Sequence, residues 1–310
     1  MGGGCQLQRD IKKKFNAETL HATSVRLGQV DFINCLPMNL PIELGEVKVN
    51  AQIINAVPSK LNEMILNSEI DIAPVSSYAY LQNKDKLMPV GDLCIASNGC
   101  ADSVLLFSKC PIEELNDAKI GLSHASATSN MLLKVLLKEF YNLGNEFEVI
   151  TSPSLILPPK ARLALSGGNS QFSILNFQSC PAYLLIGDHA LLEFSKSLEN
   201  IFIYDLGTLW KKHTGLPMVF GMWVARKEVV EQYPDKIKII VDQLNQSKGI
   251  GLTTLFNKVV KKAQEKVLIT NDFYELYFKH LSYEFTDECK KGLSLFEEYC
   301  KKLSSVLSMV

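Results

Sequence analysis

The sequence has little that points to a membrane or to nucleic acid. It contains no run of about eighteen apolar residues, roughly the length that a membrane-spanning helix needs. Its 32 lysine and arginine residues stand against 33 aspartate and glutamate residues, and no basic cluster occurs. Nucleic-acid binding depends on such clusters, because each neutralised phosphate adds affinity. We therefore expect neither a membrane span nor a nucleic-acid partner.

Disulfide and metal frameworks are also missing. The eight cysteines form no C-x-x-C pair and no zinc-type spacing with histidine. Most lie in apolar surroundings, where a thiol behaves as a small buried hydrophobe, and this scatter favours a reducing compartment. Residues 1–24 lack the apolar core of a secretory signal peptide and predict a poorly ordered extension. We expect a cytoplasmic protein.

Several common catalytic sequences do not occur. The chain has no G-x-G-x-x-G after a strand, no Walker sequence, no G-x-S-x-G and no H-E-x-x-H. Its carboxylates at Asp92, Asp102 and Asp188 stand apart rather than in pairs. These absences argue against the usual nucleotide, serine-hydrolase and zinc-peptidase sites. They leave a site built from neutral side chains.

The chain does contain 47% hydrophobic residues, enough for two domains with real cores. Strand and helix patterns alternate from residue 25 onwards, which predicts an α/β fold with mostly parallel sheets covered on both faces. We expect two lobes with a ligand cleft between them, outside the carboxyl ends of the strands. Lobe 1 comprises 25–103 and 207–310, and lobe 2 comprises 104–206, inserted into lobe 1. The Pro/Gly/Ser-rich stretch 154–179 predicts a long surface loop.

Strands are expected where apolar residues alternate or run together. The segments are VRLGQV, VKVNAQIINA, EIDIAPVS, 103–108, 119–122, FEVIT, AYLLIG, IFIYDL and MVFGMWVAR. A helix begins at Pro58, a strong helix covers 130–142, and the chain after Arg226 is expected to be helical throughout. The chain is expected to pass between the lobes near 103–108 and again near 205–218.

Small polar residues follow several of these strands. Asn34 ends the strand in VRLGQVDFINCLP, although turn chemistry alone explains an Asn there. SHASATSN (123–130) precedes the strong helix, where free N–H groups and the helix dipole favour an anion, although an ordinary N-cap by Ser129 is the alternative. Ser103 starts a strand at the expected lobe crossing, where a lone serine is ordinarily a packing compromise. The expected ligand-binding residues are Ser76, Ser77, Ser126, Thr128, Ser129, Asp188, Gly215 and Leu216.

A site of Asn, Ser, Thr and free backbone amides is a set of neutral hydrogen-bond groups. Such a set suits a polycarboxylate ligand, which further acidic side chains would repel. The pattern therefore predicts a two-lobed anion binder. It leaves open whether the protein is an enzyme.

Six motifs together resemble the chorismate dehydratase family of menaquinone biosynthesis, over roughly 25–227 and more loosely over the tail. They are FINCLP, EIDIAPVSS, DLCIASNG with DSVLLFSK, TSNMLLKVLL, LLIGDHAL and YDLGTLWKKHTGLPMVFGMWVARK. The resemblance implies a periplasmic-binding-protein type II fold. It also implies removal of water from chorismate to give 3-[(1-carboxyvinyl)oxy]benzoate, the entry step of the futalosine route. No metal or organic cofactor is implied.

The resemblance further implies that Asn34 and Ser103 are the catalytic residues. Asn34 is expected to hold and polarise the substrate, and Ser103 to hydrogen-bond the departing hydroxyl or relay its proton. The expected base is the enolpyruvyl carboxylate of the substrate itself. This chain departs from the family at Pro181-Ala182, where the family usually has Asp-Ala.

Two alternatives stay open. One is a non-catalytic solute-binding protein of the same fold. The other is the sister enzyme of the same pathway, 1,4-dihydroxy-6-naphthoate synthase, which has a histidine in the strand-end motif where this chain has Gly187. Conversion of chorismate to the aromatic product separates the leading hypothesis from both.

Overall fold

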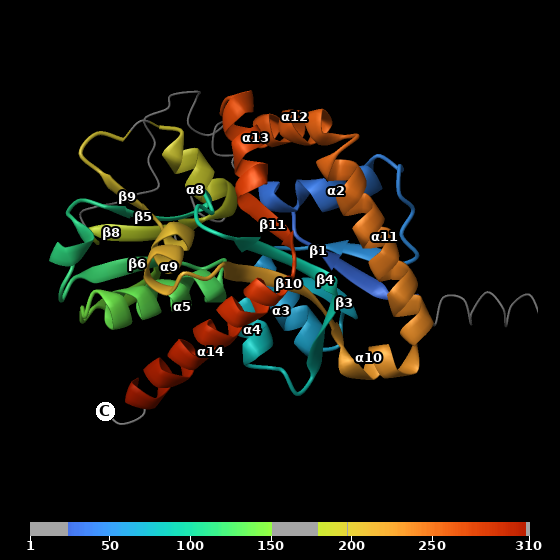
Figure 1. The fold of residues 1–310 in the computed structure, drawn as a ribbon, viewed down its shortest axis with the longest axis horizontal. Coiled ribbons are helices and arrows are strands. Elements are labelled where there is room, and N and C mark those ends of the chain that lie inside the picture. Colours follow the sequence, from blue (N-terminus) through green and yellow to red (C-terminus); the bar gives the residue numbers. More distant parts are fainter. Residues whose placement is uncertain (1–23, 151–178, 197, 308–310) are drawn as a thin grey trace, which may run out of the picture.

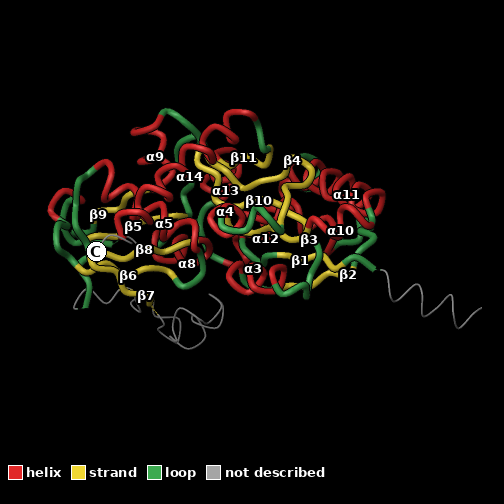
Figure 2. Tube along the Cα trace, turned by 90° about the horizontal axis from the view of Figure 1, so that it is seen from below, coloured by secondary structure: helices red, strands yellow, loops and turns green. Residues whose placement is uncertain are grey.

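The computed structural model describes residues 24–150, 179–196 and 198–307. The predicted N-terminal extension, 1–24, and the predicted loop, 154–179, fall outside these residues except for Ser24 and Ser179. Within the described ranges, no helix combines the length and the apolarity that crossing a membrane requires. The elements form two groups, each built around one sheet, which lie side by side in Figures 1 and 2.

The larger sheet has six strands in the order β11-β4-β10-β3-β1-β2. Strand β1 pairs in parallel with β2 and β3, the pairing that crossover helices allow. Strand β10 runs antiparallel to β3 and β4, and β11 runs antiparallel to β4. The strand bounds are β1 Arg26–Gln29, β2 Gln52–Asn55, β3 Ile72–Ser76, β4 Leu87–Ser97, β10 Met218–Arg226 and β11 Leu281–Glu284.

The smaller sheet has five strands in the order β7-β6-β8-β5-β9. Strand β6 is parallel to β7 and β8, whereas β5 is antiparallel to β8 and β9. The strand bounds are β5 Val104–Ser108, β6 Lys119–Ser123, β7 Glu146–Ile150, β8 Ala182–Ile186 and β9 Phe202–Asp205.

Helices cover both sheets and join them (Figure 1). Those before the smaller sheet are η1 Ile33–Cys35, α2 Leu36–Glu43, α3 Pro58–Leu66 and α4 Ser77–Leu81. The helices that lie between or directly after the strands of the smaller sheet are η2 Ile112–Glu114, α5 Ala127–Val135, the π-helical η3 Leu136–Phe140, α8 Gly187–Phe194 and α9 Leu206–Thr214. The tail contains α10 Lys227–Gln232, α11 Pro234–Leu252, α12 Phe256–Lys266, α13 Asn271–His280 and α14 Asp287–Leu307.

Both sheets are mixed, so the prediction of mostly parallel sheets was wrong. In the larger sheet β4 leads to the smaller sheet and β10 returns from it. Because β4 carries the chain out of the larger sheet and β10 carries it back, the two strands run in opposite directions and pair antiparallel. The α/β class itself is as expected.

Two strands of the larger sheet escape the sequence pattern. Strand β4 contains Pro89 and Gly91, which interrupt its alternation, and Gly91 has φ 72°. Strand β11 has four residues and follows α13 directly, so the chain after Arg226 is not wholly helical. Because β11 lies at the edge next to β4, the tail adds a strand to the larger sheet as well as covering it.

One large apolar cluster contains buried residues from both sheets and from the tail. Helix α14 starts beside the larger sheet and runs toward the smaller one, where it contacts α5 (Figure 1). The indole of Trp210 on α9 packs edge-on against Phe296 and Tyr299 of α14, and its Nε1 donates to Pro217 O at 3.2 Å. The tail thus fixes the two groups of elements relative to each other, and with them the walls of the site.

Candidate functional site

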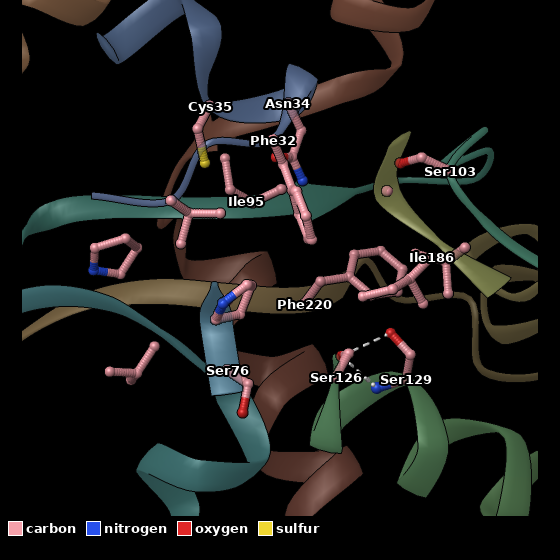
Figure 3. A pocket seen from close by; sticks show the side chains of 17 residues that line it. Phe32, Asn34, Cys35, Ser76, Ile95, Ser103, Ser126, Ser129, Ile186 and Phe220 are labelled. Carbon is pink, nitrogen blue, oxygen red and sulfur yellow. Dashed lines mark hydrogen bonds between the residues drawn. The ribbon is translucent and has the colours of Figure 1, made fainter. Parts of the chain in front are cut away.

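A pocket lies where the two sheets approach each other (Figure 3). It encloses about 590 Å³ of empty space, part of it open to solvent. Several of the residues that line it end or follow β1, β3, β6 and β8. The carboxyl ends of strands are where ligands bind in open α/β sheets. Its polar lining residues are Asn34, Ser76, Ser103, Ser126 and Ser129. The sequence predicted all five of them.

The remaining lining is mostly apolar, with Phe32 and Phe220 facing the space (Figure 3). None of the described lining residues carries a charged side chain. The thiol of Cys35 also lines the pocket, and burial raises its pKa to about 12, so it stays protonated. The pocket is therefore a neutral site with a few polar groups on apolar walls, a composition typical of small-molecule sites.

Asn34 lies in the single turn η1, which follows β1. Its side chain points from this turn into the pocket (Figure 3), and its Oδ1 is buried without a hydrogen-bond partner among the described residues. The backbone around it is fixed: Ile33 N donates to Asp188 Oδ1 at 2.9 Å, and Tyr283 Oη donates to Asn34 O at 2.9 Å. A buried amide oxygen without a partner is costly unless a ligand supplies one.

Ser103 immediately precedes β5, at the point where the chain enters the smaller sheet. The residue is buried, and its Oγ donates to Ala101 O at 3.2 Å and lies 3.1 Å from Tyr277 Oη. Its carbonyl accepts a 2.7 Å hydrogen bond from Gly187 N. The side chain thus reaches the pocket from a rigid strand start.

Three serines face the pocket from the starts of α4 and α5 (Figure 3). Ser76 caps α4 by accepting from Ala79 N at 3.3 Å. Ser126 caps α5 by accepting from Ser129 N at 3.1 Å and donates to Ser129 Oγ at 3.0 Å. The ordinary capping interpretation therefore describes Ser76 and Ser126, and the cap of α5 is Ser126 rather than Ser129.

The other predicted ligand-binding residues do not line the pocket. Thr128 is fully buried and accepts from Tyr78 N at 2.9 Å, which joins α5 to α4. Ser77 is fully buried, and its Oγ has no partner among the described residues. Gly215 (φ 72°) and Leu216 lie at the C-terminal end of α9, where Gly215 supplies the left-handed cap.

Asp188 lies behind the Asn34 turn instead of in the pocket. It is 4% exposed, and its Oδ2 pairs with Lys266 Nζ at 3.0 Å. Burial raises the pKa of Asp188, while Asp188 and Asp31 hold the pKa of Lys266 above its usual range despite burial. Lys266 also donates to Asp31 O at 2.6 Å. This ion pair connects α8, the Asn34 turn and α12.

The sequence missed the tail residues that support the site. Tyr277, Tyr283 and Lys266 come from α13, β11 and α12, far from Asn34 and Ser103 along the chain. Burial raises the pKa of Tyr277 and of Tyr283 well above the usual range, so both hydroxyls stay neutral donors. No strand-end pattern marks these residues.

Among the described residues, one group has three side-chain ligand atoms within 4.8 Å of one another: Cys100, Asp102 and His280. His280 Nδ1 already lies 2.6 Å from Asp102 Oδ2, and Cys100 Sγ accepts from Thr208 Oγ1 at 3.2 Å. None of the three lines the pocket. Their contacts are those of an ordinary hydrogen-bonded group at the passage from β4 to β5.

Solved structures share this architecture. A protein of Archaeoglobus fulgidus superposes with a TM-score of 0.69 at 15% identity, covering 91% of this chain and 98% of that chain. The periplasmic aliphatic sulphonate-binding protein of Escherichia coli gives a TM-score of 0.56 at 12% identity, covering 91% and 92%. At such identities the likeness concerns the fold alone. It confirms the expected periplasmic-binding-protein-like fold.

Related sequences are more specific. The chain is 28% identical over 286 residues to a chorismate dehydratase of Thermus thermophilus, which covers 88% of this chain and 93% of that relative. It is 28% identical over 224 residues to a chorismate dehydratase of Campylobacter jejuni, covering 68% and 75%. The profile of a family described as menaquinone biosynthesis matches residues 25–302. This match spans most of the sequence, and the chain therefore belongs to the menaquinone-biosynthesis family.

Proposed function

We propose that this protein is a chorismate dehydratase, a lyase that eliminates water from chorismate to give 3-[(1-carboxyvinyl)oxy]benzoate in menaquinone biosynthesis. The relatives of Thermus thermophilus and Campylobacter jejuni carry this activity in their names. The observation that carries the proposal is the uncharged pocket that brings Asn34 and Ser103 together. Asn34 follows β1 of the larger sheet and Ser103 immediately precedes β5 of the smaller sheet, about seventy positions later in the sequence. Both side chains nevertheless reach the same space (Figure 3).

The substrate has two carboxylates, one hydroxyl and an apolar ring. Removal of the ring proton that is vinylogous to the ring carboxylate spreads charge into that carboxylate. Neutral donors aimed at the developing charge stabilise the transition state, and aromatisation of the ring favours loss of the hydroxyl. A pocket with apolar walls and a few hydroxyl and amide groups fits such a substrate.

We assign roles to two side chains. Asn34 holds and polarises the substrate through its amide, whose Oδ1 is otherwise without a partner among the described residues. Ser103 donates a hydrogen bond to the departing hydroxyl. The enolpyruvyl carboxylate of the substrate acts as the base, because no described lining residue offers a carboxylate, amine or imidazole. Ser76, Ser126 and Ser129 line the opposite wall and contact the bound ring or its carboxylates.

We also propose the lobe boundaries and the compartment. Lobe 1 comprises 25–103 and 207–310 and lobe 2 comprises 104–206, a division supported by the strand membership of the two sheets. The pocket is then an interlobe cleft. The protein acts in the cytoplasm, which is supported by seven free cysteines among the described residues.

One observation favours a solute-binding protein as the second candidate. The sulphonate-binding protein of Escherichia coli shares the fold and, by its name, binds an anion. Position 187 argues against the sister enzyme, 1,4-dihydroxy-6-naphthoate synthase. Gly187 has φ 56°, and a Cβ there lies 3.0 Å from the ring of Phe32, so a histidine at this position meets both backbone strain and the Phe32 ring.

The test is incubation of the purified full chain with chorismate, followed by liquid chromatography and mass spectrometry. The proposal predicts 3-[(1-carboxyvinyl)oxy]benzoate as the product. Saturable binding of chorismate without any product supports the solute-binding candidate instead. If chorismate neither binds nor gives product, the pocket takes a different ligand.

A further inference from the structure

Tyr277 is the residue that touches Ser103 from behind the pocket. It comes from α13, is 1% exposed, and does not line the pocket. Its ring stacks on Phe273 at a centroid distance of 6.2 Å and meets Phe278 edge-on at 5.2 Å. The position of its hydroxyl is therefore fixed by packing on both sides.

The hydrogen bond between these two side chains has a direction. Among the described residues, Ser103 Oγ is the one hydrogen-bond partner of the Tyr277 hydroxyl, at 3.1 Å. Ser103 has a second partner, because its own proton reaches Ala101 O at 3.2 Å. A buried phenol proton needs an acceptor, so Tyr277 donates and Ser103 accepts.

We propose that Tyr277 is a positioning residue for Ser103: its hydroxyl donates to Ser103 Oγ, so that the serine proton turns from Ala101 O toward the hydroxyl that leaves the substrate. This inference rests on the proposed function. Ser103 has one proton, and accepting from Tyr277 leaves that proton for the substrate. Acceptance also polarises the serine O–H bond, which strengthens its donation to the departing oxygen.

The elimination balances without a proton from the tyrosine. The ring C–H bond and the ring C–O bond break, the C–H electron pair enters the aromatic ring, and the oxygen leaves with the C–O pair. The proton taken by the enolpyruvyl carboxylate equals the one that completes the water. Ser103 and Tyr277 therefore keep their protons and act through hydrogen bonds alone.

Burial keeps Tyr277 a donor over a wide pH range, because it raises the pKa of the phenol well above its usual range. The titratable groups that face it come from four directions: Cys35 in η1, Asp102 before β5, Asp188 in α8 and Tyr283 in β11. Cys35 and Tyr283 are themselves held neutral by burial. The phenol thus supplies the same hydrogen bond at neutral and mildly alkaline pH.

The main test compares Tyr277→Phe with Tyr274→Phe. Tyr274 is a matched control, because it lies one turn away in the same aromatic cluster, is fully buried, and donates to Val267 O at 2.7 Å instead of to Ser103. We expect Tyr277→Phe to lower kcat by roughly 10-fold to 100-fold with little change in KM. Tyr274→Phe is expected to keep the wild-type kcat at a temperature where both variants are folded.

A double-mutant cycle separates positioning from general support. If Tyr277 acts through Ser103, Tyr277→Phe has no further effect on kcat in a Ser103→Ala background. An equal fall in kcat in both backgrounds overturns the inference. Equal kcat for the Tyr277 and Tyr274 variants overturns it too. Wild-type protein that makes no product from chorismate contradicts the proposed function itself, which is a separate outcome.

A second substitution covers the case in which Tyr277→Phe does not fold. Replacement of Tyr277 by 3-fluorotyrosine keeps the ring and the hydroxyl but makes the phenol more acidic. We expect kcat at neutral pH to change, because a more acidic phenol donates a stronger hydrogen bond to Ser103 Oγ. The same replacement at Tyr274 is expected to leave kcat unchanged, and equal kcat for the two fluorinated proteins overturns the inference.

Discussion

The backbone around Asn34 is fixed by three hydrogen bonds, whereas its side chain is open to the pocket. Tyr283 Oη donates to Asn34 O at 2.9 Å, and Ile33 N donates to Asp188 Oδ1 at 2.9 Å. Cys35 N donates to Phe32 O at 3.0 Å. A polar group held in place before the substrate arrives needs little reorganisation during reaction. For this reason we place catalysis at Asn34.

Removal of either proposed catalytic side chain is expected to affect turnover more than binding. Asn34→Ala and Ser103→Ala should each lower kcat by roughly 10²-fold or more, because each removes a group that acts on developing charge. The dissociation constant for chorismate should change much less. Steady-state kinetics and calorimetric titration measure the two quantities, with the exposed Ser195→Ala as the control. Unchanged turnover in either variant removes that residue from the mechanism.

The sequence predicts the residues that sit at strand ends, and it misses those that reach the site from elsewhere. Asn34 and Ser103 follow or precede a strand, and the edge of a sheet gathers such residues by geometry. Tyr277 and Lys266 come from tail helices, where their sequence positions carry no sign of what they contact. The predicted Thr128 and Asp188 are polar residues at helix starts, but other protein groups occupy their side chains.

At the scale of elements, α11 supports the Asn34 turn from outside. It packs against α2, which follows η1 directly. Gly251 of α11 lies so close to α2 that a Cβ there comes within 1.9 Å of Pro37 O. Ser247 Oγ on the same helix donates to Met38 O at 2.5 Å. The lack of a side chain at position 251 sets how closely α11 approaches the turn.

Two glycine substitutions in α11 test this contact. Gly251→Ala is expected to lower the free energy of unfolding by about 1–3 kcal/mol, because the backbone of Pro37 cannot move away cheaply. Gly249→Ala in the same helix has no atom within 4 Å of the new Cβ and is expected to raise it by about 0.5–1 kcal/mol. Urea unfolding measures both values. Equal stability of the two variants contradicts the proposed close contact.

The ends of three strands in the larger sheet are joined by one buried carboxylate. Asp71, just before β3, accepts from Arg26 Nη2 of β1 at 2.8 Å and from Arg226 Nη2 of β10 at 2.8 Å. Burial alone raises the pKa of Asp71, but these hydrogen bonds more than offset it and hold the pKa below its usual range. Arg26 and Arg226 are 200 residues apart in the sequence, so this contact joins distant parts of the chain within the larger sheet.

The lowered pKa of Asp71 makes its contribution depend on pH. Asp71 stabilises the fold above about pH 4, the usual range of the unfolded carboxyl, and this stabilisation is lost as pH falls through the lower pKa of the folded state. Asp71→Asn is expected to cost about 2 kcal/mol at neutral pH and to weaken the acid dependence. Chemical unfolding at pH values from about 3 to about 7, a range that covers the carboxyl titration, measures this pH dependence. The exposed Asp242→Asn, whose partner is Lys238, should change stability by less than about 0.5 kcal/mol.

Strand direction is the part of the fold that the sequence could not supply. The alternation of strands and helices predicts crossover units, and β1, β2 and β3 form them. Strands β4 and β10 carry the chain between sheets, and an apolar run such as MVFGMWVAR looks the same whether it runs parallel or antiparallel. Pairing between β10 and β4 depends on residues more than a hundred positions apart, which local patterns do not report.

At the scale of the whole molecule, contacts between the two sheets surround the pocket. Thr128 accepts from Tyr78 N, Asp188 accepts from Ile33 N, and the ring of Phe32 lies against Gly187. Each contact joins an element of one sheet to an element of the other. A substrate in the pocket touches both sides at once and is expected to stabilise the folded protein in proportion to its affinity.

We propose that Asn34 and Ser103, brought together by this fold, catalyse the dehydration of chorismate. A proton NMR time course of chorismate with the wild-type protein, Asn34→Ala and Ser103→Ala tests this proposal. With the wild type, the ring signals of chorismate are expected to give way to those of 3-[(1-carboxyvinyl)oxy]benzoate, and with both variants far more slowly. Chorismate that persists with the wild type, or disappears equally fast with all three, contradicts it.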